Sequence, residues 1–93
     1  MRYTWDAGKN KRNIQLRKIA FEDAVRIFDG PTLEVEDDRF DYGEIRIKAI
    51  GRMNDILLVV VIYSDRSSDE RRIISARKAE RQEAEEYYRA IFG

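Results

Sequence analysis

The first third of the chain has apolar residues spaced as they are in helices. Residues 21–28 place apolar side chains at positions i, i+3, i+4 and i+7, which share one face of a helix. The Asp-Gly-Pro sequence at residues 29–31 ends that helix. Before it, residues 2–5 are typical of a short strand, and Asp6 is a good N-cap for a helix that ends near residue 17. The N-terminal part therefore predicts a strand followed by two helices.

From Thr32 onward, apolar and polar residues alternate with a period of two. Residues 33–35 and 45–49 predict a hairpin with one solvated face. Residues 56–63 are apolar at every position, which is typical of a central strand, and residues 71–76 pair back on it. Residues 78–92 favour a last helix. The β-α-α-β-β-β-β-α order predicts an α+β fold, with two N-terminal helices on a mainly antiparallel sheet and a C-terminal helix.

Length and composition restrict the class of protein. A chain of 93 residues with 43% hydrophobic content is expected to form a single domain over residues 1–93. The absence of Cys and His argues against disulfides and against most zinc or iron sites, so we expect no metal site and no cofactor. No signal-peptide pattern opens the chain, and its longest apolar run is too short to cross a bilayer. We expect a cytoplasmic protein with no membrane partner.

Charge is segregated along the chain although the formal net charge is zero. Residues 1–20 carry six basic side chains against one acid, and residues 21–44 carry nine acids against two arginines. Residues 45–82 are again basic, with nine cations and five acids. This pattern predicts a basic surface opposite an acidic one. A mixed, fully solvated surface is the alternative.

The sequence RRIISARKA at residues 71–79 is the most informative segment. It predicts a short apolar strand that ends with Arg77 and Lys78 at the start of a helix. The N–H groups at the N-terminus of a helix favour binding of an anion. Without His or Cys, any chemistry must use Arg, Lys, Tyr and carboxylates. The segment therefore suggests phosphate binding; a solvated helix start is the simpler reading.

Several motifs together resemble the BrnT family of toxins from type II toxin–antitoxin pairs, within the wider RelE-like ribonuclease fold. Each motif is weak alone, but their order and spacing over nearly the whole chain are specific. The matching pieces are Trp5, Asp6, Lys9 and Asn13; FEDAVRIFDGP at 21–31; DDRFDYGE at 37–44; Gly51; the run that ends at Arg66; and IISARKA at 73–79 with Glu83 and Tyr87.

The resemblance implies a ribonuclease that cleaves RNA and inhibits translation. It also implies a cognate BrnA-like antitoxin with a ribbon-helix-helix DNA-binding domain. The toxin–antitoxin complex would repress its own operon, so DNA would be contacted only through the antitoxin.

One departure from the family pattern bears on mechanism. Members usually carry a Lys-His-Gly triplet where this chain has Leu16, Arg17 and Lys18. Arg17 could keep a phosphate-binding role but not a proton-transfer role, because a guanidinium keeps its proton in proteins. A catalytically inactive binding module or co-repressor is therefore the alternative function.

Cleavage by the 2′-OH of RNA requires a base, a proton donor and cations that stabilise the phosphorane. We expect Arg66 and Arg77 to bind the scissile phosphate, and Lys78, Glu44 or Lys9 to transfer protons. This scheme is a metal-independent endoribonuclease. The expected RNA-binding residues are Lys9, Arg12, Asn13, Arg17, Arg46 and Lys48.

Overall fold

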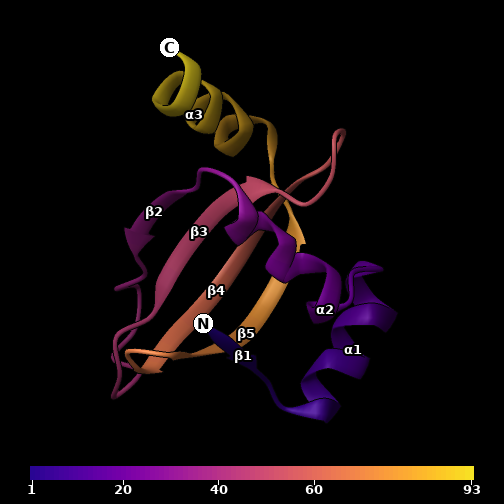
Figure 1. Ribbon diagram of the computed structural model, residues 1–93, viewed down its shortest axis with the longest axis vertical. Helices are drawn as coiled ribbons and strands as arrows, with labels where there is room; N and C mark the ends of the chain where they lie inside the picture. Colours follow the sequence, from indigo (N-terminus) through magenta and orange to yellow (C-terminus); the bar gives the residue numbers. More distant parts are fainter.

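A five-stranded sheet lies at the centre of the computed structural model, which describes residues 1–93 (Figure 1). The strand order is β1-β5-β4-β3-β2. β1 runs parallel to β5, and all other pairs are antiparallel, so the predicted mainly antiparallel sheet is confirmed. The strands are β1 (Arg2–Thr4), β2 (Leu33–Glu36), β3 (Ile47–Arg52), β4 (Leu58–Ser67) and β5 (Glu70–Lys78).

Helices pack on both faces of this sheet. α1 (Ala7–Arg17), α2 (Phe21–Ala24) and the 3₁₀ helix η1 (Val25–Asp29) lie on one side. α3 (Arg81–Phe92) lies at one end of the other face, close to β2 and β3 (Figure 1). The α+β architecture predicted from the sequence is therefore confirmed. None of the three α-helices has the length and apolar character of a membrane span.

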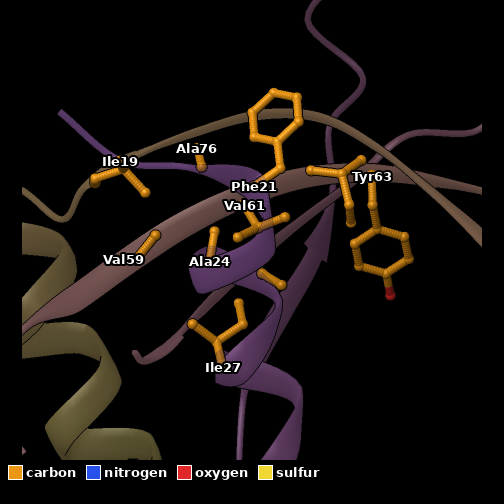
Figure 2. Close-up of a cluster of buried hydrophobic side chains, with 10 residues drawn as sticks. Ile19, Phe21, Ala24, Ile27, Val59, Val61, Tyr63 and Ala76 are labelled. Atoms are coloured by element: carbon orange, nitrogen blue, oxygen red, sulfur yellow. The ribbon is translucent and has the colours of Figure 1, made fainter. Parts of the chain in front are cut away.

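Two apolar clusters hold the layers together, because successive residues of a strand point to opposite faces. On the α1 and α2 face, Phe21, Ala24 and Ile27 pack on Val59 and Val61 (Figure 2). On the α3 face, a smaller cluster contains Ile50, Leu58, Val60 and Tyr87. The continuous apolar run in β4 is explained by burial on both faces.

The second helix differs from its prediction. Residues 21–28 do not form one α-helix: α2 ends at Ala24, and η1 continues as a tighter 3₁₀ helix. Within η1, Ile27 is fully buried and lies against Gly51 of β3. β-branched residues such as Val25 and Ile27 favour the α-helix weakly, so close packing on the sheet decides the geometry here.

Several element boundaries also differ from the prediction; β3, for example, spans Ile47–Arg52 rather than residues 45–49. The central strand begins at Leu58 rather than Ile56, because the Asn54 side chain accepts the backbone N–H groups of Ile56 and Leu57 and extends the turn. The last helix begins at Arg81, since Lys78 is still paired with Val59 in the sheet. Arg77 and Lys78 are therefore strand residues and not the start of a helix.

Side-chain hydrogen bonds attach α1 to the rest of the domain. Asp6 caps the helix by accepting the Lys9 N–H at 2.9 Å, as predicted. The Asn10 amide accepts the Phe21 N–H at 2.9 Å, and Asn10 is the buried residue of this helix. The Asn13 amide donates to the Ile19 carbonyl and accepts the Ala76 N–H of β5. α1 is thus held mainly by asparagine side chains.

Candidate functional site

Nine of the ten residues predicted for the site lie in or next to three surface hollows, and these hollows are separate. The sheet-face hollow has a volume of about 230 Å³ and is lined by Glu36, Asp37, Asp38, Arg39, Lys48, Ile62 and Arg77. The α1 hollow has about 280 Å³ and is lined by Lys9, Arg12, Asn13, Leu16, Arg17, Ile74 and Ser75. The loop hollow has about 480 Å³ and is lined by Glu44, Ile45, Ile47, Ser64, Asp65 and Arg66.

Behind the sheet-face hollow, one carboxylate joins two cations from different strands. Glu83 of α3 accepts hydrogen bonds from Nη1 and Nη2 of Arg77 at 2.8 and 2.9 Å. The Nζ of Lys48 lies 2.7 Å from Oε2 of the same carboxylate. Two of the predicted RNA-binding and catalytic residues are thereby brought together on the sheet face that α3 partly covers.

Glu83 is held firmly in this arrangement. Its residue is 8% exposed, and Oε1 also accepts the Glu80 N–H at 2.8 Å in a capping box at the start of α3. The Arg77 guanidinium, above all, lowers the pKa of Glu83 to about 2. The carboxylate is therefore ionised at neutral pH and is too weak a base for proton transfer.

A second ion pair lines the same hollow. Arg39 donates from Nε and Nη2 to the two carboxylate oxygens of Asp37, at 2.8 and 3.0 Å. The bidentate Arg39 bond lowers the pKa of Asp37. Tyr42 donates to Asp37 at 3.2 Å, and the Arg46 guanidinium lies 4.0 Å from the Tyr42 ring centre. This loop therefore carries its own ordered set of charges.

The loop hollow repeats the arrangement of two cations around one carboxylate. Glu44 accepts Nε of Arg46 at 3.0 Å and Nη1 of Arg66 at 2.7 Å. The bonds from Arg46 and then Arg66 lower the pKa of Glu44. Glu44 was predicted as a possible base, but a carboxylate held ionised by two arginines accepts a proton poorly at neutral pH.

The predicted pair of phosphate-binding arginines is not assembled. Arg77 is paired with Val60 in the sheet, and Arg66 lies six residues further along β4. At about 3.3 Å per residue, the two arginines are about 20 Å apart along the strands. They cannot bind one phosphate, so the expectation of a shared site is wrong.

Lys78 is also separated from Arg77. Neighbouring residues of a strand point to opposite faces, and Lys78 is paired with Val59, whose side chain is in the α1 and α2 cluster. Arg77 is paired with Val60, whose side chain is in the α3 cluster. Lys78 lines none of the hollows and is not placed to transfer a proton at Arg77.

The α1 hollow has a different electrostatic character. No acidic residue lies in α1, and the five cations at residues 9, 11, 12, 17 and 18 form no salt bridge. The three that line the hollow are Lys9, Arg12 and Arg17, which are among the residues expected to bind RNA. Asn13 also lines it, but both ends of its amide are already bonded to the backbone. The hollow is therefore a basic surface whose charges are not neutralised by the protein.

Sequence reasoning missed two site residues. Glu83 was noted only as part of the resemblance, although Glu80 and Glu83 have the three-residue spacing of a capping box and lie close to Arg77 in sequence. Arg39 was treated as part of a polar connection, and no sequence signal indicated that its loop folds over the sheet. Chemically, the α1 hollow favours binding of anions because three cations and no acid line it, whereas three cations and three acids line the sheet-face hollow.

A five-stranded sheet with helices on both faces carries an unpaired basic surface on α1, which suits the binding of an anionic polymer. The family profile described as "Ribonuclease toxin, BrnT, of type II toxin-antitoxin system" matches residues 5–83. The chain belongs to the BrnT family.

A solved structure supports this assignment. The ribonuclease toxin BrnT of Brucella abortus, known from a crystal structure, superposes with a TM-score of 0.65 at 25% sequence identity. The match covers 87% of this chain and 99% of the Brucella chain. No curated protein matches the sequence. Sequence family and fold agree in placing this chain among ribonuclease toxins of type II toxin–antitoxin systems.

Proposed function

We propose that the protein is an endoribonuclease whose RNA substrate crosses β5 between the α1 hollow and the sheet-face hollow. One observation carries this proposal: Ser75 lines the first hollow and Arg77 lines the second, two residues apart on the same strand. That separation is about 7 Å along a strand. An RNA backbone lying across the strand would contact the unpaired α1 cations on one side and Arg77 with Lys48 on the other.

In the proposed reaction, the 2′-oxygen of RNA forms a bond to the adjacent phosphorus while the bond from phosphorus to the 5′-oxygen breaks. The products are a 2′,3′-cyclic phosphate and a free 5′-OH. Water takes the proton of the 2′-OH and returns one to the leaving oxygen, because Glu44 and Glu83 both have lowered pKa values. Arg77 and Lys48 stabilise the negative charge that builds up on phosphorus. No step of this scheme uses a metal ion.

The family supplies the class of partner, a protein antitoxin. We propose a BrnA-like antitoxin with a ribbon-helix-helix domain, which would silence the toxin and, in complex with it, repress their operon. The site of action would be the cytoplasm, where RNA cleavage stops translation. The basic, unpaired surface of α1 is the part of the toxin that an acidic segment of such a partner would recognise.

A catalytically weak binding module remains the second candidate, and it is favoured by the absence of a histidine and by the low pKa values of the two site carboxylates. The test is controlled expression with and without the neighbouring gene, followed by growth measurement and an RNA gel. Purified protein is then incubated with RNA, with and without a chelator. Growth arrest with new RNA ends, unchanged by chelator, supports the ribonuclease. Growth arrest without new ends supports the binding module.

A further inference from the structure

We propose that Glu83 is a positioning residue that holds Lys48 and Arg77 as a pair for one RNA phosphate. This inference rests on the proposed function, and it names the part of the site that prepares the cations before RNA binds. The side chain acts through Arg77 and Lys48 and does not itself touch the RNA.

The first argument is the distance between the two cations in the sheet. Lys48 lies on β3 and Arg77 on β5, with β4 between them. Strands are about 4.8 Å apart, so the two backbones are separated by about 10 Å. Both side chains are long and repel each other, and without an anion between them they would spread into solvent. Glu83 supplies that anion from a third element, α3.

The second argument is the side from which Glu83 approaches. Lys48 and Arg77 line the sheet-face hollow, whereas Glu83 does not. Its oxygens are shared among the Arg77 guanidinium, Lys48 and the Glu80 N–H, and the residue is buried. The carboxylate therefore contacts the cations from behind and leaves their other side open.

The third argument is the number of donors that remain. A guanidinium has five N–H donors. Arg77 uses three, two toward Glu83 and one toward the Lys78 carbonyl. An ammonium has three donors, and Lys48 uses one. About four N–H groups stay available, and the two positive charges exceed the single charge of Glu83. A phosphodiester, with one negative charge, balances the net charge of Lys48, Arg77 and Glu83. Arg39 and the acids Glu36, Asp37 and Asp38 line the same hollow.

The experiment measures RNA cleavage kinetics and the binding of an oligonucleotide with 2′-deoxy substitutions, which binds but cannot be cleaved. Glu83→Gln keeps the shape and removes the charge; Glu83→Asp keeps the charge and withdraws it from the cations. We expect both variants to lower kcat by about tenfold or more, because small misplacements of catalytic groups are costly. We also expect weaker binding of the uncleavable RNA. The matched control is Glu85→Gln, which removes an exposed carboxylate on the same helix.

A double-variant cycle distinguishes positioning from a structural role. If Glu83 acts through Arg77, adding Glu83→Gln to Arg77→Ala should cause no further loss of kcat. The proposal would be overturned if adding Glu83→Gln to Arg77→Ala lowered kcat further and lowered the melting temperature in parallel. Faster cleavage or tighter RNA binding by Glu83→Gln would overturn it as well, since Glu83 would then compete with phosphate. Wild-type protein that binds RNA without cutting it would refute the ribonuclease; unchanged binding by both Glu83 variants would refute the positioning role.

Discussion

Arg77 and Lys78 are adjacent in β5, and their side chains point to opposite faces of the sheet. Arg77 faces the α3 side, where it meets Glu83, and Lys78 faces the side of α1 and α2. Two neighbouring cations that look equivalent in the sequence therefore have different surroundings. This difference allows the proposed site to be tested with two neighbouring substitutions.

We expect Arg77→Ala to reduce RNA cleavage by about a hundredfold or more, because it removes a cation that stabilises the transition state. Lys78→Ala should change the rate by less than about twofold. Arg77→Lys should restore part of the activity, since an ammonium lacks the bidentate geometry. Initial rates on a defined RNA, with melting temperatures for each variant, provide the measurement. Equal losses for the two alanine variants would contradict the assignment of the active face.

The position of the family histidine gives a second prediction. Arg17 lies in the α1 hollow, and no histidine is present anywhere in the chain. We expect Arg17→His to increase RNA cleavage and to introduce a pH dependence near the imidazole pKa, about 6.5. Cleavage rates from pH 5 to 8 provide the measurement. A flat profile with an unchanged rate would mean that this hollow binds RNA but takes no part in proton transfer.

The unpaired charges of α1 predict how the antitoxin associates. We expect the association rate to fall steeply between low and physiological salt, because exposed charges attract over distances that salt screens. Reversing Lys9 and Arg12 to Glu should slow association by about tenfold or more. Stopped-flow mixing with the purified antitoxin at several salt concentrations measures both effects.

The control for this experiment must remove exposed cations elsewhere. Glu34 is unsuitable for a charge reversal, because its carboxylate accepts hydrogen bonds from Tyr63 and Thr32. Arg26 and Arg89 are exposed and form no ion pair, so their double reversal to Glu matches the α1 variant in charge. Equal slowing by both double variants would indicate an effect of net charge alone. Association insensitive to salt would point to an apolar docking surface.

Glu83 also predicts a loss of stability in acid. Its folded pKa is about 2, below the ordinary value for a glutamate, so its contribution is complete above about pH 4.3 and is lost as the pH falls toward 2. Over that range the wild type should lose about 2 to 3 kcal/mol more stability than Glu83→Gln. Urea unfolding at pH 5, 3.5 and 2.5 provides the measurement. Parallel losses in the two proteins would show that other carboxylates control acid unfolding.

Gly51 gives a prediction about packing. A Cβ at this position would lie 2.8 Å from Cβ of Ile27, whereas a Cβ at Gly30 would have no neighbour within 4 Å. We expect Gly51→Ala to destabilise the domain by about 1 to 3 kcal/mol through overpacking of β3 against η1. Gly30→Ala should stay within about 0.5 kcal/mol of the wild type. Thermal unfolding of the two variants compares the sites directly; similar melting temperatures would contradict the packing argument.

Local patterns were sufficient for most of the fold. Asp6 as an N-cap and the central place of β4 in the sheet depend on neighbouring residues and were predicted correctly, whereas the alternation in residues 45–49 placed β3 two residues too early. The errors occur where contacts between residues far apart in the sequence determine the secondary structure. Val25 and Ile27 lie in a 3₁₀ helix in which Ile27 packs against Gly51 of β3, and Lys78 is still paired with Val59 in the sheet.

The candidate site was predicted less well, because it depends on which strand positions face each other. Lys9, Arg12 and Arg17, expected from the sequence to bind RNA, line one hollow beside α1. To predict that Lys48 and Arg77 lie close together, one needs the strand order and the position of α3. Neither follows from local sequence patterns. The proton-transfer roles expected for Lys78 and Glu44 depended on surroundings that the sequence does not reveal.

The attachment of α1 has a consequence for how this domain opens. Its side chains Ile14 and Leu16 remain largely exposed, and the helix is fixed by Asn10 and Asn13. Such hydrogen bonds fix the orientation of the helix, but their net contribution to the free energy of folding is small. The helix that carries the unpaired cations therefore has a well-defined orientation but is held weakly to the rest of the domain. We therefore expect α1 to open at a lower free energy than the sheet, whose strands hold the apolar core.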